Sequence, residues 1–239
     1  MTSVESRVDE LIEKHPGLCA ALNEGGSFVL CGDVRIDAVN EGYDYIVRDV
    51  PTRMIVPYDY PENIPKVWVE DKQMLEGYEH VFSDGSLCLG ARGELALGLQ
   101  RNCSLVDFFE GVVVGNLYAI EYHRMYGCMP SGDRSHGSVG ILEAYRELFE
   151  VDDSLAAIRL LAQATGNLKY RGHLACECGS GLRARDCHGP LILEINRGSC
   201  RKAALGDFED IYKAWVNTMM QKEKRDRGMD AIKRTLLNR

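Results

Sequence analysis

Long apolar runs are missing from this chain of 239 residues. No stretch approaches the ~20 consecutive apolar residues that a membrane-spanning helix needs. The opening residues, Met1 to Ser6, also lack the basic and then apolar pattern of a signal peptide. Nine cysteines, an odd number, in a chain without an export signal predict reduced thiols in a cytoplasmic protein.

Positive charge is scarce as well. The chain has 28 lysines and arginines against 36 acidic residues, a net charge of -8, which argues against nucleic-acid binding over the whole surface. The one basic stretch, within residues 222–234, is interrupted by acidic residues, so we expect a solvated helix face there. No glycine-rich nucleotide-binding loop follows a strand, and we do not expect the chain to activate a substrate with ATP.

The remaining composition, 45% apolar and 27% charged, is that of a globular protein with one large or two modest domains. Helical spacing predicts a helix over residues 4–23, broken at His15-Pro16-Gly17 and ended by Gly25-Gly26. Then come strand patterns at 27–40 and 43–50, a short apolar run at 53–56, a strand at 66–69, an irregular glycine-rich region at 70–103, and helical patterns at 104–125, 139–151, 154–164 and 207–238. This order predicts an α+β fold, with one domain over residues 1–150 and a helical region over 151–239.

Four candidate metal ligands lie close together near the C-terminal end: Cys176, Cys178, Cys187 and His188. Thiolates and imidazoles suit zinc, and four of them complete its tetrahedral shell. The intervening Gly179-Ser180-Gly181 allows the tight reversal that returns the second pair onto the first. We therefore predict one structural zinc per chain, which leaves no open position for catalysis. A buried or disulfide-bonded cysteine cluster is the alternative.

This stretch is similar, at the same ligand spacing, to the SEC-C zinc motif at the C-terminus of the SecA translocation ATPase and in many bacterial accessory modules. The resemblance assigns the motif to about residues 171–195 and favours His188 over His173 as the fourth ligand. Cys200 could be a spare ligand, but the set is complete without it.

The middle of the chain carries a second pattern. A Tyr60-Pro61 pair and Pro65 precede the strand at 66–69, and the segment Asp84-Gly85-Ser86-Leu87-Cys88-Leu89 follows. This resembles the core of ubiquitin-conjugating enzymes, in which such a cysteine carries a ubiquitin-like protein as a thioester. The resemblance covers roughly residues 4–130 and implies a conjugating-enzyme-like domain with Cys88 as its nucleophile.

One position departs from that family. Its members usually have an asparagine eight residues before the cysteine, whose amide steadies the oxyanion when a lysine attacks, and here that position is His80. Histidine can also donate a hydrogen bond to an oxyanion, and it titrates near neutrality. Several bacterial relatives of the conjugating enzymes resemble this chain in having histidine there. We therefore predict Cys88 and His80 as the catalytic pair.

Cysteine suits this chemistry because a thiolate is a good nucleophile and a thioester is a transferable acyl carrier. A small apolar residue in the protein interior is the alternative interpretation of Cys88. Its Gly-Ser-Leu-Cys-Leu context, together with His80, favours the nucleophile.

The resemblance implies a bacterial conjugating enzyme active in antiphage defence. The protein held as a thioester would be a ubiquitin-like carrier or a cyclic-nucleotide-synthesising signalling enzyme. It would reach Cys88 with or without the help of a separate activating enzyme. The acceptor would be a lysine of a target protein. The zinc module would be a docking surface. The alternative is a non-catalytic adaptor in which both parts only bind proteins. A metalloenzyme using His80 and His173 has no support in the ligand spacing.

Overall fold

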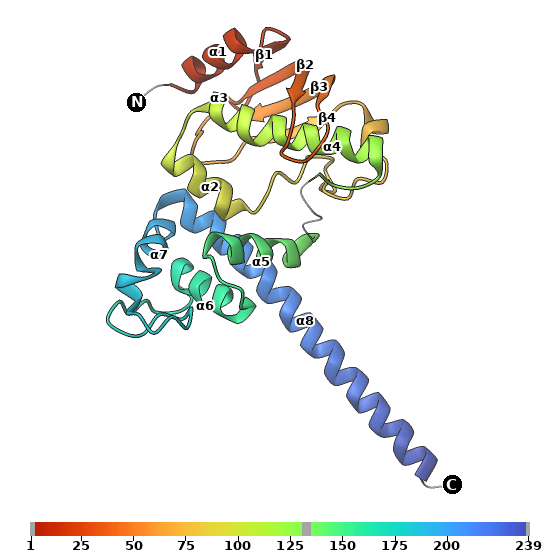
Figure 1. Ribbon diagram of the computed structural model, residues 1–239, viewed down its shortest axis with the longest axis vertical. Helices are drawn as coiled ribbons and strands as arrows, with labels where there is room; N and C mark the ends of the chain where they lie inside the picture. The colour runs from red at the N-terminus through yellow and green to blue at the C-terminus, as the bar shows by residue number, and fades with distance from the viewer. Residues whose placement is uncertain (1–2, 131–134, 238–239) are drawn as a thin grey trace.

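The computed structural model describes residues 3–130 and 135–237, and the side chains of the last helix as far as Thr218. It has the predicted α+β fold, with one helix, a four-stranded antiparallel sheet in the order β1-β2-β3-β4, and then a series of helices (Figure 1). The sheet and its covering helices form the upper part of Figure 1, and the later helices form the lower part, from which α8 extends. Among the residues described, no helix combines the length and apolar character needed to cross a membrane.

The first helix, α1, spans Val4–Lys14 and ends just before the predicted break at His15-Pro16-Gly17. Ser3 caps it, because its hydroxyl oxygen accepts a hydrogen bond from the Ser6 backbone N–H at 3.1 Å. Its buried side chains, Val8 and Leu11, belong to the core beneath the sheet.

The prediction that the helix resumes after this break and continues to residue 23 is wrong. Leu18–Leu22 is strand β1, which pairs with β2 along its whole length. Gly25 and Gly26 lie in the turn of this hairpin, where the Asn23 side chain accepts hydrogen bonds from the backbone N–H groups of Gly25 and Ser27. Five residues are too few for their apolar spacing to distinguish a helix from a strand, and pairing with β2 decides the outcome.

The rest of the sheet is a meander of β2 (Phe28–Ala38), β3 (Ile46–Val56) and β4 (Lys66–Val69). The predicted runs at 43–50 and 53–56 are one strand, since β3 pairs with β2 from Phe28↔Val56 to Ala38↔Ile46. The strand predicted at 66–69 is confirmed as β4. Alternate residues of β2 are buried, so one face of the sheet packs on helices and the other faces solvent.

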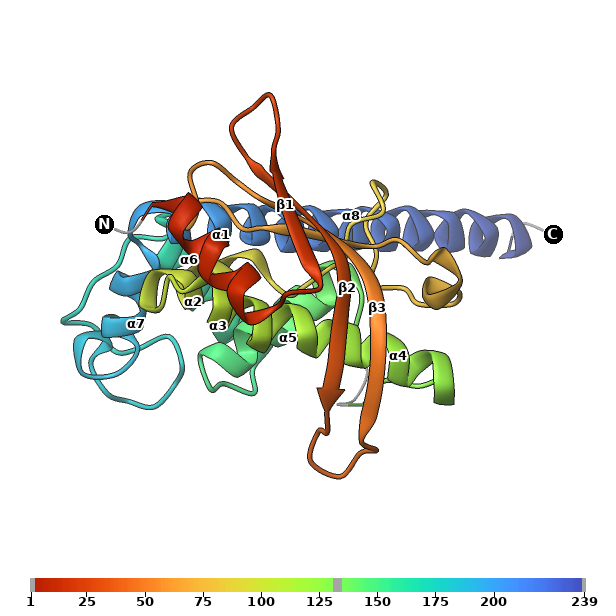
Figure 2. The same ribbon diagram turned by 90° about the horizontal axis from the view of Figure 1, so that it is seen from above.

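A long helical rod covers the buried face, and the strands cross over it in Figure 2. It consists of α3 (Leu105–Phe108), the π-helical segment η2 (Phe109–Val114) and α4 (Gly115–Tyr126). This confirms the helix predicted at 104–125, and its start at Ser104 is capped by a hydrogen bond from the Asp107 N–H to the Ser104 hydroxyl.

The region expected to be irregular contains a short 3-10 helix, η1 (Lys72–Leu75), and a helix, α2 (Arg92–Arg101). Two glycines in α2, Gly93 and Gly98, obscured its helical pattern, because glycine is unfavourable in a helix interior. Gly93 is needed for packing, since α8 approaches α2 closely at that point.

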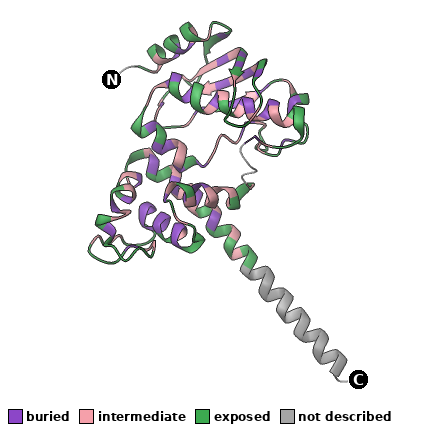
Figure 3. Ribbon diagram, in the orientation of Figure 1, coloured by how far each residue is buried: buried purple, intermediate pink, exposed green. Residues whose placement is uncertain are grey.

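The later helices build a second apolar core. They are α5 (Gly137–Leu148), α6 (Ser154–Thr165), α7 (Gly189–Ile195) and α8 (Gly198–Leu237), which begins before the predicted start at 207. Their buried side chains form one apolar cluster with those of α2, and the buried residues appear as purple segments of the ribbon in the lower part of Figure 3. Both α2 and α5 thus pack with the C-terminal helices, although they precede residue 150 in the chain.

Candidate metal centre and cysteine loop

The segment between α6 and α7 folds back on itself and brings the two ligand pairs together. Ala175 and Arg183 form an isolated antiparallel bridge, and the Cys176 N–H donates to the Leu182 carbonyl at 2.8 Å. Gly179 and Gly181 have φ angles of +80° and +78°, in the left-handed region that favours glycine. This is the reversal that the Gly-Ser-Gly segment predicted.

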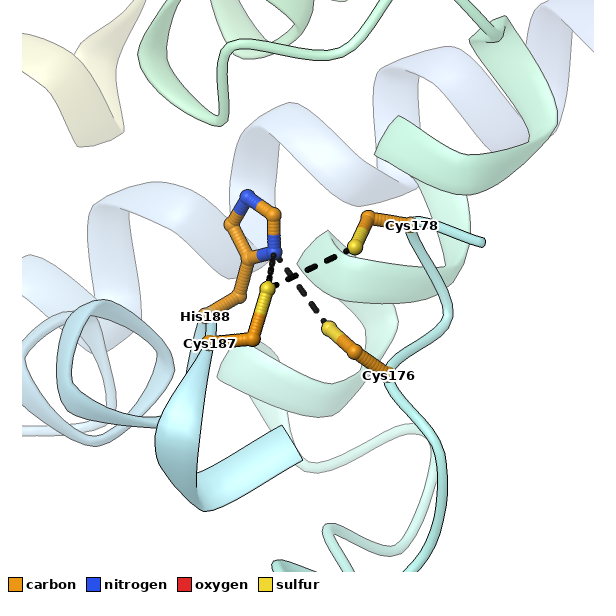
Figure 4. A group of neighbouring side chains, drawn as sticks. All are labelled: Cys176, Cys178, Cys187 and His188. Carbon is orange, nitrogen blue, oxygen red and sulfur yellow. Dashed lines mark hydrogen bonds between the residues drawn. The ribbon is translucent and has the colours of Figure 1, made fainter. Parts of the chain in front are cut away.

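The four predicted ligands converge on one point (Figure 4). Their ligand atoms all lie within 4.8 Å of one another. The His188 Nδ1 is 3.3 Å from the Cys176 Sγ and 3.2 Å from the Cys187 Sγ, and the two sulfurs of Cys178 and Cys187 are 3.5 Å apart. Zinc with Zn–S bonds of about 2.3 Å would hold tetrahedral sulfur ligands about 3.8 Å apart. The cluster could therefore bind a metal ion.

The outer nitrogen of His188 supports this interpretation. Its Nε2 lies 2.7 Å from the Phe149 carbonyl oxygen at the end of α5, a distance at which Nε2–H donates a hydrogen bond. That bond places the proton on Nε2 and leaves the Nδ1 lone pair free to face the three sulfurs. A metal-bound histidine needs this tautomer, and the same bond ties the motif to α5.

The thiols differ in acidity. Burial raises the pKa of Cys176, although the backbone N–H groups of Cys178 and His188 act in the opposite direction. For Cys178, burial also acts upward, but hydrogen bonds with the hydroxyl and backbone N–H of Ser180 and with the neighbouring cysteines lower the pKa to about 6. The lowered pKa of Cys178 favours the thiolate form, which is the form of cysteine that binds a metal.

The other candidate ligands lie elsewhere. His173 is exposed and does not belong to the cluster. Cys200 is buried in α8, with its Sγ 3.6 Å from the Gly93 carbonyl oxygen. With four protein ligands and no additional one nearby among the described residues, the site has the closed composition of a structural centre.

The predicted catalytic residues are joined through their backbones at the base of a second hairpin. Val81 and Leu87 form an isolated antiparallel bridge, and the Leu87 N–H donates to the Val67 carbonyl of β4 at 2.8 Å. The register extends one position further, because the Cys88 N–H donates to the His80 carbonyl at 2.9 Å. Directly opposite residues of an antiparallel pair project to the same side, and this backbone pairing is the basis for expecting the side chains of His80 and Cys88 on one face.

The tip of this hairpin is fixed by Asp84. Its carboxylate accepts hydrogen bonds from the Ser86 hydroxyl at 2.5 Å and the Ser86 N–H at 3.0 Å, and it pairs with the Lys66 ammonium at 2.9 Å. The bond from the Ser86 hydroxyl, followed by that from Lys66, holds the pKa of Asp84 well below its usual range. The Trp68 indole N–H also donates to the Asp84 carbonyl at 3.1 Å, so the loop is attached to β4 by both side chains.

Cys88 is a half-buried free thiol in the irregular segment between the hairpin and α2. It lies outside the apolar core cluster and outside the strands of the sheet, although it is less exposed than the thiol of an open groove would be. Burial raises its pKa, and the Asp207 carboxylate adds to the effect, while a hydrogen bond from the Gly90 backbone and the charge of Arg92 oppose it. The thiol is therefore mostly protonated at neutral pH.

Sequence reasoning missed the side chains around this pair. The His136 ring lies 4.2 Å from the His80 ring between centroids, and its Nε2 is 2.6 Å from the Glu79 carboxylate. The buried Tyr78 ring lies 5.8 Å from the His80 ring, and burial, followed by the nearby Cys88 sulfur, raises the pKa of Tyr78 to about 12. Tyr78 and Glu79 could have been found from the sequence, because they directly precede His80. His136 could not, because it comes from a distant part of the chain.

Behind Cys88, the start of α2 is fixed by α8. The fully buried Asp207 carboxylate accepts hydrogen bonds from the Gly93 N–H at 2.7 Å, the Arg92 Nε–H at 2.8 Å and the Tyr145 hydroxyl at 3.0 Å. A carboxylate at a helix N-terminus is stabilised by the free N–H groups and the helix dipole. The position of the Cys88 segment therefore depends on the C-terminal helix.

Comparisons with models of protein families, with curated proteins and with solved structures find no match to this chain.

Proposed function

We propose that this protein is a ubiquitin-conjugating-like acyl transferase with Cys88 as its nucleophile. The observation that carries the proposal is the backbone hydrogen bond between Cys88 and His80 across the hairpin, because residues opposite one another in an antiparallel pair project to the same side, and a ring donor on that side would serve the half-buried free thiol. The order of elements supports it: a helix, four antiparallel strands, a loop with the cysteine, helix α2 and then a long helical rod follow one another, and the resemblance implies the helix, strands, cysteine loop and long helix in this order.

Two steps make up the proposed reaction. In loading, the Cys88 sulfur attacks the carbonyl carbon of a donor thioester, the donor's carbon–sulfur bond breaks, and the departing thiolate takes up the proton that Cys88 loses. In discharge, a lysine amine attacks the same carbon, the bond to the Cys88 sulfur breaks, and the sulfur recovers a proton from the amine. The tetrahedral intermediate of the discharge step carries negative charge on oxygen, and the His80 ring N–H is the group that would stabilise it there.

The raised pKa of Cys88 suits a carrier of acyl groups. A thiol of high pKa is a poor leaving group, so its thioester survives until an oriented amine attacks. The partner and setting remain those that the resemblance implies, a ubiquitin-like carrier or a cyclic-nucleotide-synthesising enzyme in bacterial antiphage defence.

We also propose that the metal is zinc and that its role is structural. The ion would be held by Cys176, Cys178, Cys187 and His188. It would cross-link the two halves of the segment between α6 and α7. Leu174 and Leu182 are exposed on this segment, so a rigid loop would present them to a partner protein.

The test of acyl transfer uses the full chain and a fluorescent peptide ending in Gly-Gly as a mercaptoethanesulfonate thioester. We expect a dithiothreitol-sensitive adduct that maps to Cys88 by mass spectrometry and is lost in C88A. The C103A variant, which removes another half-buried thiol, should load normally. In H80A, loading should persist while discharge to free lysine slows about a hundredfold, the typical effect of losing an oxyanion donor. Equal labelling of C88A and the wild type would contradict the proposal.

A non-catalytic adaptor is the second candidate. The observation that favours it is the partial burial of Cys88, which limits access to the sulfur and, by raising the pKa of the thiol, lowers the fraction of nucleophilic thiolate. An adaptor would form no adduct on Cys88, and C88A would bind its partner as tightly as the wild type does.

A further inference from the structure

The C-terminal helical layer contributes a side chain to the candidate catalytic site. His136 stands at the start of α5, a helix whose buried residues belong to the second apolar core. From there its ring reaches the His80 ring, with centroids 4.2 Å apart and ring planes inclined by 46°. The cysteine loop and α5 therefore meet through two histidines.

A carboxylate anchors the outer ring. The Nε2 of His136 lies 2.6 Å from an oxygen of Glu79, the residue immediately before His80. A histidine that donates a ring N–H to a carboxylate is restrained in both its rotation and its tautomer. His136 is thus a fixed surface against which the His80 ring rests, while the Tyr78 ring lies 5.8 Å away from His80.

We propose that His136, anchored by Glu79, is a positioning residue that directs the His80 ring toward the acyl group on Cys88. This inference rests on the acyl transfer proposed above. An oxyanion donor acts only from about 3 Å, and a misplacement of about 1 Å can slow a reaction a hundredfold. His136 acts through His80 and need not touch the substrate.

The pair is well suited to mutation. The side chains of His136 and Glu79 are 39% and 73% exposed, so their ion pair contributes little to the stability of the fold. Variants at these positions should therefore fold, and their effects on the two reaction steps can be separated.

The experiment loads the full chain with the Gly-Gly peptide thioester, removes excess donor and chases with free lysine. We expect H136A and E79A to load as the wild type does and to discharge about tenfold more slowly. E79Q should discharge within about twofold of wild type, because its amide oxygen still accepts the His136 hydrogen bond. H173A, which removes an exposed histidine in the metal-binding segment, is the matched control and should discharge normally.

A double-mutant cycle decides whether His136 works through His80. In the H80A background, adding H136A should slow discharge no further, because there is no ring left to position. Three outcomes would overturn the positioning role of His136 and leave the acyl transfer standing. They are additive losses in the double variant, discharge of H136A at the wild-type rate, and an equal slowing of loading and discharge in H136A. Failure of the wild-type chain to load Cys88 at all would overturn the acyl transfer and, with it, this inference.

Discussion

The Asp207 carboxylate accepts the backbone N–H of Gly93 at 2.7 Å, and this bond joins the long helix α8 to the segment that follows Cys88. The same carboxylate is fully buried and also accepts hydrogen bonds from Arg92 and Tyr145. One acidic residue of the C-terminal helix thereby organises the helix start next to the candidate nucleophile. The helices after residue 150 are consequently part of the site's support.

Replacing Asp207 by alanine should lower the free energy of unfolding by about 3 kcal/mol, because a buried N–H and a buried hydroxyl lose their acceptor and Arg92 loses a buried partner. Urea unfolding measures the loss. The matched control is D210N, which removes the other carboxylate that pairs with Arg92. Because the Asp210 side chain is 46% exposed, that change should cost less than about 1 kcal/mol. Equal losses in the two variants would show that burial of Asp207 is unimportant.

Two glycines of α2 should respond in opposite directions to alanine. A Cβ on Gly93 would lie 2.0 Å from the Tyr145 hydroxyl oxygen and 2.9 Å from the Ala204 Cα, so G93A must push α2 away from α8. Such overpacking typically costs about 1–3 kcal/mol. A Cβ on Gly98 meets nothing within 4 Å, and G98A should stabilise the helix by up to about 1 kcal/mol. Thermal unfolding of both variants tests this, and a stabilised G93A would be inconsistent with the close packing.

The sequence predicted features that depend on local chemistry. Ligand spacing predicted the Cys-His cluster, a capping hydroxyl predicted the helix start at Ser104, and a proline-bounded apolar run predicted strand β4. All three are present. The errors lie where distant contacts decide. Leu18–Leu22 is a strand because β2 pairs with it, and α2 tolerates Gly93 because α8 packs there. His136 and Asp207 reach the cysteine loop only through the packing of α5 and α8, which no spacing along the chain encodes.

Metal removal gives the third prediction. Purified protein should contain about one zinc per chain, and C178S should lose it, because a thiolate ligand is replaced by a weakly binding hydroxyl. The loss should loosen the segment between α6 and α7, seen as faster proteolysis there. C19S, which changes an exposed cysteine on β1, should keep the metal and the wild-type cleavage pattern. Full zinc content after changing both Cys178 and Cys187 would exclude this site.

The last prediction concerns the protonation of Cys88. Burial raises its pKa above the ordinary thiol value, so the thiolate is the minor form at neutral pH and its fraction grows about tenfold with each pH unit until the pKa is reached. The rate at which iodoacetamide labels the Cys88 peptide, followed by mass spectrometry, should therefore keep rising through about pH 9, where a small-molecule thiol of pKa about 8.5 levels off. Loading with the peptide thioester should share this profile, because the same thiolate attacks in both reactions. A labelling rate that levels off near pH 7 would mean that the thiol is activated rather than restrained by its surroundings, and His80 would then be the first neighbour to test as its base.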